Sequence, residues 1–231
     1  MTKNLAIIPL RSGSKRIKDK NIKFLNQKPL FYYSIQAALT SKLFDKIIVS
    51  SDSQKYLNQV RQQFKNIKKM ELAIRPKNIS NSKSTTELSI NHILKKNINF
   101  ENIFLIQVTS PLLHYKDLIK GHKSFIHNKL DSLFSGYISD SFIWSYKKNN
   151  VLLSENYDFK NRPMSQDFKN KKIIENGAFY IFKYKKYLKF RNRLFGKIGF
   201  YKMNNYLSMD IDNHRDFKLA EFIQINKKFF S

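Results

Sequence analysis

The sequence predicts an α/β fold in which helices cover both faces of a mostly parallel, mixed sheet in three layers. Apolar strand-like runs alternate with segments of helical periodicity in the first half of the chain, which is typical of parallel sheets. The 231 residues suffice for one full hydrophobic core, so we expect a single domain over 1–231. A polar, aromatic-dotted stretch at about 133–172 is expected to leave the main sheet.

The elements follow from apolar spacing. Leu5–Ile8 is a short apolar run that ends in a polar loop, as expected of a buried strand. Residues 30–43 carry apolar side chains at helical spacing, and 46–50 follows as a strand, which completes a strand-helix-strand unit. The other predicted elements are helices at 54–64, 86–96 and 217–229 and strands at 71–74, 104–108, 175–182 and 206–210.

Polar residues follow three of these strands directly. They are Arg11, Asp52 and the segment 107–110. Ligands of parallel α/β sheets bind at the carboxyl ends of the strands. The sequence therefore predicts one site at this edge.

The loop after the first strand has the layout of a phosphate-binding loop. Small residues at 12–14 let the backbone turn so that its N–H groups can face an anion. The cations that would neutralise a triphosphate are Arg11, Lys15, Arg16 and Lys20. The glycine triplet of dinucleotide-binding folds and the Gly-Lys-Ser/Thr ending of a Walker loop are both missing, so neither of those interpretations fits.

Asp210 and Asp212 stand two residues apart near the end of the chain. If this segment is extended, both carboxylates leave the same face. Mg²⁺ binds one or two carboxylates together with phosphate oxygens and water, so the pair suits this ion. In the alternative interpretation, Asp212 or Asn213 caps the next helix.

Composition excludes several classes of protein. There is no cysteine, which excludes a disulfide scaffold and thiolate chemistry. No apolar run approaches the roughly 18 residues of a membrane span, and no signal peptide is visible, so we expect a cytoplasmic protein without a membrane span. The net charge of +26 invites a nucleic-acid interpretation, but the lysines are scattered in pairs along the chain. The favoured interpretation is that these lysines are solvated surface residues without a specific ligand. The open alternative is that their positive electrostatic field steers anionic substrates toward the protein.

Five further sequence motifs follow the cationic loop along the chain. In chain order they are Phe44–Asp52, Arg75-Pro76, Gln107–Leu112, Glu175–Tyr180 and Asp210–Asp212. Together with the loop, these blocks resemble the acylneuraminate cytidylyltransferases, the CMP-sialic acid synthetase family, over nearly the whole chain. The resemblance implies a Rossmann-like nucleotidyltransferase fold with a small dimerisation extension at about 133–172, and therefore a homodimer.

The resemblance also implies which residues bind the nucleotide. The loop would hold the triphosphate of CTP, Arg75 would lie near the cytosine base, and Mg²⁺ would bind Asp210 and Asp212. The implied catalytic residues are Arg11, Lys15, Lys20, Asp210 and Asp212. The implied nucleotide-binding residues are Arg11, Ser14, Lys15, Asn21, Arg75, Ser84, Gln107 and Ser110. Residues 80–83 depart from the family's pattern, which leaves the strength of the cytosine preference and the contact of Ser82 open.

A second implied group binds the sugar acid. Its members are Gln107, Arg162, Gln166, Asn176 and Gly177. A guanidinium can hold a carboxylate with two parallel hydrogen bonds, which suits Arg162, although its spacing to Gln166 is looser than usual in the family. For Gln107, a buried strand glutamine that satisfies backbone groups is the competing interpretation.

The resulting expectation is an enzyme that transfers CMP from CTP to the anomeric hydroxyl of a nonulosonic, sialic-type acid and releases pyrophosphate. Two alternatives remain open. One is a related nucleotidyltransferase for pseudaminic acid, legionaminic acid, another sugar acid or a sugar phosphate. The other is a basic nucleic-acid-binding protein with a degenerate nucleotide fold, which would bind nucleic acid with steep salt dependence and consume no CTP.

Overall fold

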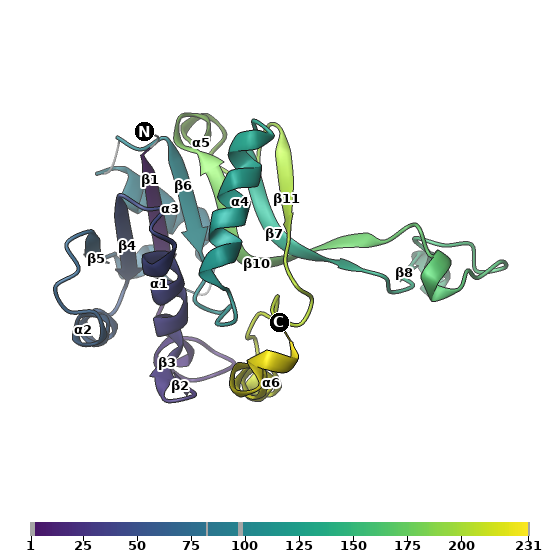
Figure 1. The fold of residues 1–231 in the computed structure, drawn as a ribbon, viewed down its shortest axis with the longest axis horizontal. Helices are drawn as coiled ribbons and strands as arrows, with labels where there is room; N and C mark the ends of the chain where they lie inside the picture. The colour runs from purple at the N-terminus through teal and green to yellow at the C-terminus, as the bar shows by residue number, and fades with distance from the viewer. Residues whose placement is uncertain (1–2, 82, 97–98, 231) are drawn as a thin grey trace.

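Seven strands form one mixed sheet in the order β11-β7-β10-β6-β1-β4-β5. The computed structural model describes residues 3–81, 83–96 and 99–230 (Figure 1). The strands are β1 (Asn4–Pro9), β4 (Lys46–Ser51), β5 (Met70–Ile74), β6 (Asn102–Ile106), β7 (Ser132–Ser139), β10 (Lys172–Lys183) and β11 (Ile198–Lys202). The mostly parallel, mixed sheet predicted from the sequence is confirmed.

Strand β1 lies near the middle of this sheet, parallel to both of its neighbours. Ile7 pairs with Ile48 of β4 on one side and with Leu105 of β6 on the other. Strand β10 is antiparallel to both β6 and β7, which makes the sheet mixed. The carboxyl ends of β1, β4 and β6 therefore meet at one edge, as the sequence predicted.

Helices cover the sheet on both faces, which confirms the three layers. The helices are α1 (Leu30–Ser41), α2 (Gln54–Gln63), α3 (Thr86–Leu94), α4 (Tyr115–His127), α5 (Tyr184–Phe190) and α6 (His214–Ile225). Phe31 of α1 and Phe125 of α4 pack on one face in the same core cluster as Ala6. Ile90 of α3 and Tyr187 of α5 pack on the other face, because alternate residues of each strand point to opposite sides.

Two short hairpins lie outside the main sheet. They pair β2 (Phe24–Leu25) with β3 (Lys28–Pro29), and β8 (Trp144–Tyr146) with β9 (Leu152–Ser154). The second hairpin belongs to residues 140–171, which join β7 to β10 and project from the body of the molecule (Figure 1). We call residues 140–171 the arm. Single 3₁₀ turns occur at Lys20–Ile22, Lys77–Ile79, Lys148–Asn150, Ser165–Asp167 and Lys227–Phe229.

The sequence prediction needs three corrections. The excursion was placed too early, because β7 pairs with β10 and β11 in the main sheet and only the arm leaves it. The predicted strand at 206–210 is wrong, since 205–208 form a turn and the preceding strand is β11. Helices α4 and α5 were not predicted. No helix within the described ranges 3–81, 83–96 and 99–230 is both long and apolar enough to cross a membrane.

Candidate active site

A cleft of about 390 Å³ opens at the carboxyl edge of the sheet, between the loop after β1 and the segment before α6. Nine of the residues predicted for the site line it. They are Arg11, Ser14, Lys15, Lys20, Asn21, Arg75, Ser84, Gln107 and Asp212. The two ends of the chain therefore meet across one cavity that cations dominate.

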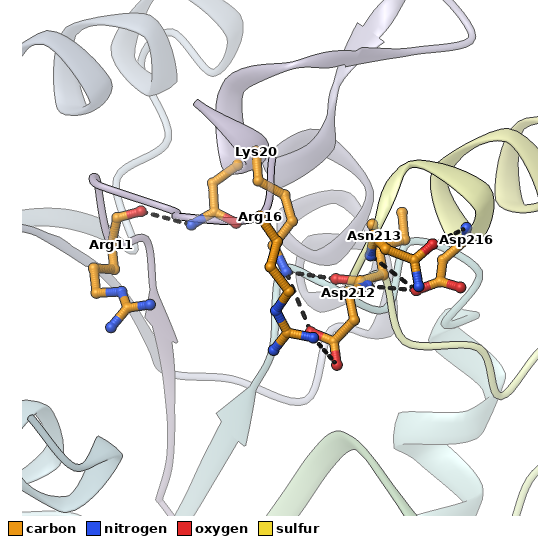
Figure 2. Close-up of polar contacts among 8 residues, drawn as sticks. Arg11, Arg16, Lys20, Asp212, Asn213 and Asp216 are labelled. Carbon is orange, nitrogen blue, oxygen red and sulfur yellow. Dashed lines mark hydrogen bonds and ion pairs between the residues drawn. The ribbon is translucent and has the colours of Figure 1, made fainter. Parts of the chain in front are cut away.

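The cationic loop closes on itself and leaves backbone donors free. The side-chain amide of Asn21 donates a hydrogen bond to the carbonyl of Arg11 over 2.7 Å and so joins the start of the loop to its end (Figure 2). Gly13 has a φ of +69°, a conformation that glycine adopts without strain. In the described part of the chain, no hydrogen bond engages the N–H groups of residues 13–16, which fits a loop that binds an anion.

Two cations of the loop point to Asp212 (Figure 2). Arg16 Nη1 lies 3.1 Å from Asp212 Oδ2, and Lys20 Nζ lies 3.8 Å from Oδ1. Lys20 Nζ also donates a hydrogen bond to the carbonyl of Ile211. Burial lowers the pKa of Lys20, and the nearby carboxylates of Asp210 and Asp212 oppose that shift. The loop after β1 is thus tied directly to the acidic segment.

Asp210 lies next to the segment that follows β6. The main-chain N–H of Ile211 donates to the carbonyl of Thr109 over 2.8 Å, and the Thr109 hydroxyl hydrogen-bonds to the Asp210 carboxylate. Asp210 is exposed and does not line the cleft; desolvation by the surrounding protein atoms is the first cause that raises its pKa, and Asp212 adds to the shift. The predicted extended strand is absent at 206–210, so hydrogen bonds to Thr109, and not sheet pairing, position this acidic pair.

Helix α6 begins immediately after the acidic pair. Asn213 is its N-cap and accepts a hydrogen bond from the N–H of Asp216, while the Asp216 carboxylate accepts one from the N–H of Asn213 at 3.0 Å. Asp216 also accepts the N–H of Asp212 at 2.8 Å. Asn213 therefore caps the helix, as one interpretation of the sequence held, and the Asp212 side chain is left for the cleft.

Arg75 forms the buried wall of the cleft and is only 3% exposed. Its Nε donates to Ser80 Oγ over 2.7 Å and its Nη1 to the carbonyl of Ser50 over 3.0 Å. Burial lowers the pKa of Arg75. Arg11 Nη1 reaches the carbonyl of Asn81 over 3.1 Å, so the phosphate loop also contacts the segment after Arg75. Ser82 lies outside the described residues.

Gln107 and Ser110 sit where β6 ends. The N–H of Gln107 donates to the carbonyl of Ala178 over 3.0 Å, and its carbonyl accepts the Ser34 hydroxyl over 2.9 Å. The Ser110 hydroxyl is buried without a hydrogen-bond partner in the described structure, as is Asn21 Oδ1. Buried polar atoms of this kind call for a partner such as a ligand or water. Ser110 does not itself line the cleft.

Of the five predicted sugar-binding residues, only Gln107 lines the cleft. Arg162 and Gln166 lie on the arm, where the Arg162 guanidinium stands 4.4 Å from the Phe142 ring centre. The side-chain oxygen Oδ1 of Asn176 accepts hydrogen bonds from Ser135 Oγ and Ala178 N at 2.8 and 3.1 Å, so this side chain serves the β7–β10 pairing. A sugar-binding role for these residues and for Gly177 stays a prediction.

Sequence reasoning missed Thr109 and undervalued Arg16. Thr109 stands between two predicted site residues, so its place after a buried strand was a usable signal. Arg16 was counted among the cations of the loop but not among the site residues. No local sequence pattern could predict the ion pair between Arg16 and Asp212, because 196 positions (212 − 16) separate the two residues.

The fold and the cleft define an α/β nucleotidyltransferase. A solved structure titled CMP:2-keto-3-deoxy-manno-octonic acid synthetase complexed with CTP shares the fold with a TM-score of 0.68. It is 12% identical and covers 98% of this chain and 100% of its own. The chain belongs to the cytidylyltransferase family, since the family model described as Cytidylyltransferase matches residues 5–230.

Two relatives illustrate the similarity within the family. An N-acylneuraminate cytidylyltransferase of Escherichia coli is 32% identical over 234 aligned positions, which cover 98% of this chain and 53% of the relative. A pseudaminic acid cytidylyltransferase of Campylobacter jejuni is 30% identical over 229 positions and 96% of both chains. The chain thus spans about half of the first relative and nearly all of the second.

Proposed function

We propose that the protein transfers CMP from CTP to a nonulosonic acid. The anomeric hydroxyl of the sugar acid attacks the α-phosphorus of CTP, the bond from the α-phosphorus to the oxygen bridging the β-phosphorus breaks, and pyrophosphate leaves. The observation that carries this proposal is the meeting of Arg16 and Lys20 with Asp212, which joins the cationic loop and the acidic segment at one cleft. Membership of the cytidylyltransferase family supports CTP as the donor.

The cations of the loop supply the electrostatic part of this reaction. Arg11, Lys15 and Lys20 line the cleft, where they would neutralise the triphosphate and the charge that grows on the departing pyrophosphate. Free N–H groups at 13–16 would add donors to phosphate oxygens. Arg75, held rigidly by Ser50 and Ser80, would form the wall beside the base.

Asp210 and Asp212 would hold Mg²⁺. No group of three or more histidine, cysteine, aspartate or glutamate residues suited to a metal is found within the described residues. Mg²⁺ needs only one or two carboxylates when phosphate oxygens and water complete its shell, so this pair fits the ion. When bound, it would polarise the phosphoryl oxygens as a Lewis acid.

The sugar acid is the finer part of the proposal. A sialic-type acid is favoured by the resemblance in sequence motifs, whereas the Campylobacter jejuni relative named for pseudaminic acid matches along 96% of both chains. Both acids carry the carboxylate and the anomeric hydroxyl that the reaction uses. We also propose a cytoplasmic homodimer in which the arm brings Arg162 and Gln166 to the cleft of the second subunit.

A substrate panel tests the function. Purified protein is incubated with CTP, Mg²⁺ and one acid at a time, namely N-acetylneuraminic, pseudaminic, legionaminic or 3-deoxy-manno-octulosonic acid. Pyrophosphate release and the CMP-sugar product are measured together. We expect one nine-carbon acid to give a kcat/KM at least about tenfold above the others, since a lost polar contact in a binding site costs that much or more. No product from any acid would contradict the proposal.

A further inference from the structure

The corner between β4 and α2, residues 51–56, forms hydrogen bonds to the start of the phosphate loop. Asp52 follows β4 and accepts two hydrogen bonds from Ser12: the N–H reaches Oδ1 over 2.8 Å and the hydroxyl reaches Oδ2 over 2.5 Å. Such bonds to a carboxylate are roughly twice as strong as neutral ones. Asp52 does not line the cleft, so its carboxylate contacts the loop and not the cavity.

The same corner also forms a hydrogen bond to the end of the loop. Tyr56, in the first turn of α2, is 2% exposed and donates its hydroxyl proton to Asp19 Oδ1 over 2.7 Å. Burial raises the pKa of Tyr56, and the hydrogen bond to Asp19 raises it further, so the hydroxyl keeps its proton. Asp19 has a φ of +53° and its carbonyl accepts the N–H groups of Ile22 and Lys23. Its placement therefore sets the turn that presents Lys20.

The loop carries charges that repel one another, both between these two attachments and directly beside them. Arg11, Lys15, Arg16 and Lys20 all lie on it and line one cleft. Like charges held close together favour an open loop, and the carboxylates of Asp52 and Asp19 at its base oppose that tendency. A loop already fixed in its binding shape loses less entropy when it takes up an anion.

We propose that Asp52 and Tyr56 are positioning residues that hold the phosphate loop in the shape that binds the triphosphate of the nucleotide. This inference rests on the proposed function, because it assumes CTP as the ligand. The two residues act through Ser12 and Asp19 and do not contact the nucleotide.

The test compares Asp52→Ala, Asp52→Asn and Tyr56→Phe with a matched control, Asp45→Ala. Asp45 stands before β4, at the opposite end of the strand from Asp52, and its carboxylate accepts the N–H of Asn4 over 2.8 Å. We expect Asp52→Ala and Tyr56→Phe to weaken CTP binding, measured by calorimetry, by about tenfold or more, because small displacements of binding groups have effects of this size. Asp52→Asn keeps one acceptor for Ser12 but loses the negative charge at the base of the loop, so its CTP affinity should lie between those of Asp52→Ala and wild type. Asp45→Ala should match wild type even if its melting temperature falls.

Two further readouts separate positioning from general destabilisation. With CTP raised to saturation, the kcat of Asp52→Ala should recover to within about threefold of wild type, which leaves the defect in KM. Trypsin should cut the unliganded variants after Lys15 and Arg16 faster than it cuts wild type or Asp45→Ala. If wild type turns over CTP, and wild type and Asp52→Ala show equal CTP affinity and equal cleavage, the positioning inference is overturned while the proposed function stands. Faster cleavage of the variants together with a wild type that converts no CTP supports the anchoring and refutes the proposed function.

Discussion

Two aspartates that are nearly adjacent in the sequence have different surroundings, and Asp212 lines the cleft whereas Asp210 does not. Asp212 is paired with Arg16 and Lys20, whereas Asp210 hydrogen-bonds to Thr109 and has a raised pKa. Desolvation is the first cause of that shift, and the neighbouring Asp212 carboxylate adds to it. Because the residue is exposed, solvent screens these effects, so an ionised Asp210 lowers the folding stability of the unliganded protein only slightly.

Asp210→Asn should make the unliganded protein more stable and much less active. A carboxyl with a raised native pKa favours folding at pH values below its ordinary pKa of 3.8, and that contribution is lost as the pH rises through the native pKa. At pH 7 the asparagine variant should therefore melt at a higher temperature than wild type, with the difference shrinking toward pH 4. Turnover should fall by about 10²–10³-fold, the usual effect of losing one electrostatic group.

Asp158→Asn is the control for this measurement. The pKa of Asp158 on the arm is lowered, first by its hydrogen bond from Asn161, so its replacement should not raise the melting temperature. A lower melting temperature for Asp210→Asn than for wild type at pH 7 would contradict the raised native pKa of Asp210. Normal formation of the CMP-sugar by Asp210→Ala would contradict the proposal that Asp210 and Asp212 hold Mg²⁺.

At the scale of elements, Asp131 joins four of them at the edge of the sheet opposite to the cleft. It precedes β7, accepts the ammonium groups of Lys183 and Lys186 at 3.2 and 2.7 Å, and accepts the N–H of Lys197 at 3.1 Å. The hydrogen bond from Lys186 is the largest cause that lowers the pKa of Asp131 to about 2. This carboxylate thus ties β7 to the end of β10, to α5 and to the start of β11.

Asp131→Asn should destabilise the fold without changing the cleft. A carboxyl with a lowered native pKa contributes stability above its ordinary pKa of 3.8 and loses it as the pH falls to about 2. Allowing for solvent screening of the half-exposed lysines, the loss at pH 7 is about 1–2 kcal/mol, or roughly 2–8 °C in melting temperature for a chain of this size. Thermal melts from pH 7 to pH 2 check this, and a temperature difference as large at pH 2 as at pH 7 would contradict it.

Local patterns predicted the elements whose apolar residues repeat without interruption. Strand β1 and helix α1 belong to this group, whereas α4 was missed because Gly121 interrupts its interior. The glycine has a tertiary cause: a Cβ there would lie 2.8 Å from the Phe179 ring of β10. Strand β11 carries only five residues and pairs with β7, more than sixty positions earlier (198 − 132 = 66), so short-range patterning says little about it.

The site was predicted better than the elements around it. Arg11 and Gln107 were placed by the rule that ligands gather at the carboxyl edge, and the structure brings both to the cleft. The hydrogen bonds of Asp52 to Ser12 and of Thr109 to Asp210 depend on how distant loops meet, which single-sequence periodicity does not encode. Arg162 and Gln166 lie on the arm, and their predicted task depends on a second copy of the chain.

At the scale of the whole molecule, two of the five predicted sugar-binding residues lie on the arm, outside the cleft of their own chain. Arg162 and Gln166 do not line that cleft. The arm also exposes large apolar side chains: Trp144 is 42% exposed, Tyr146 78% and Phe159 57%. Exposed apolar surface of this extent is typical of a region that contacts another protein.

Subunit mixing tests whether the arm serves a second subunit. Arg162→Ala and Asp210→Ala should each be nearly inactive alone. In a mixed dimer, the intact arm of the Asp210→Ala chain would complete the cleft of the Arg162→Ala chain. Re-equilibrating equal amounts should then restore up to about a quarter of wild-type activity, because half of the dimers are mixed and each holds one intact site. Absence of recovery, with mixed dimers verified by mass spectrometry, would place Arg162 outside the partner's cleft.

The net charge of +26 affects the whole surface. A positive field attracts CTP and a sugar acid, and salt screens that attraction. We expect kcat/KM for CTP to fall by about tenfold between 50 and 500 mM NaCl, whereas the inhibition constant of uncharged cytidine should change by less than about twofold. Steeply salt-dependent binding of duplex DNA without any CTP consumption would favour the nucleic-acid alternative instead.

Strand β10 runs from the arm into the sheet beside β6, with a bulge between Glu175 and Tyr180. It leaves the arm at Lys172, and Ala178 within it accepts the N–H of Gln107. The arm and the backbone of Gln107, a residue of the cleft, are therefore attached to one and the same strand.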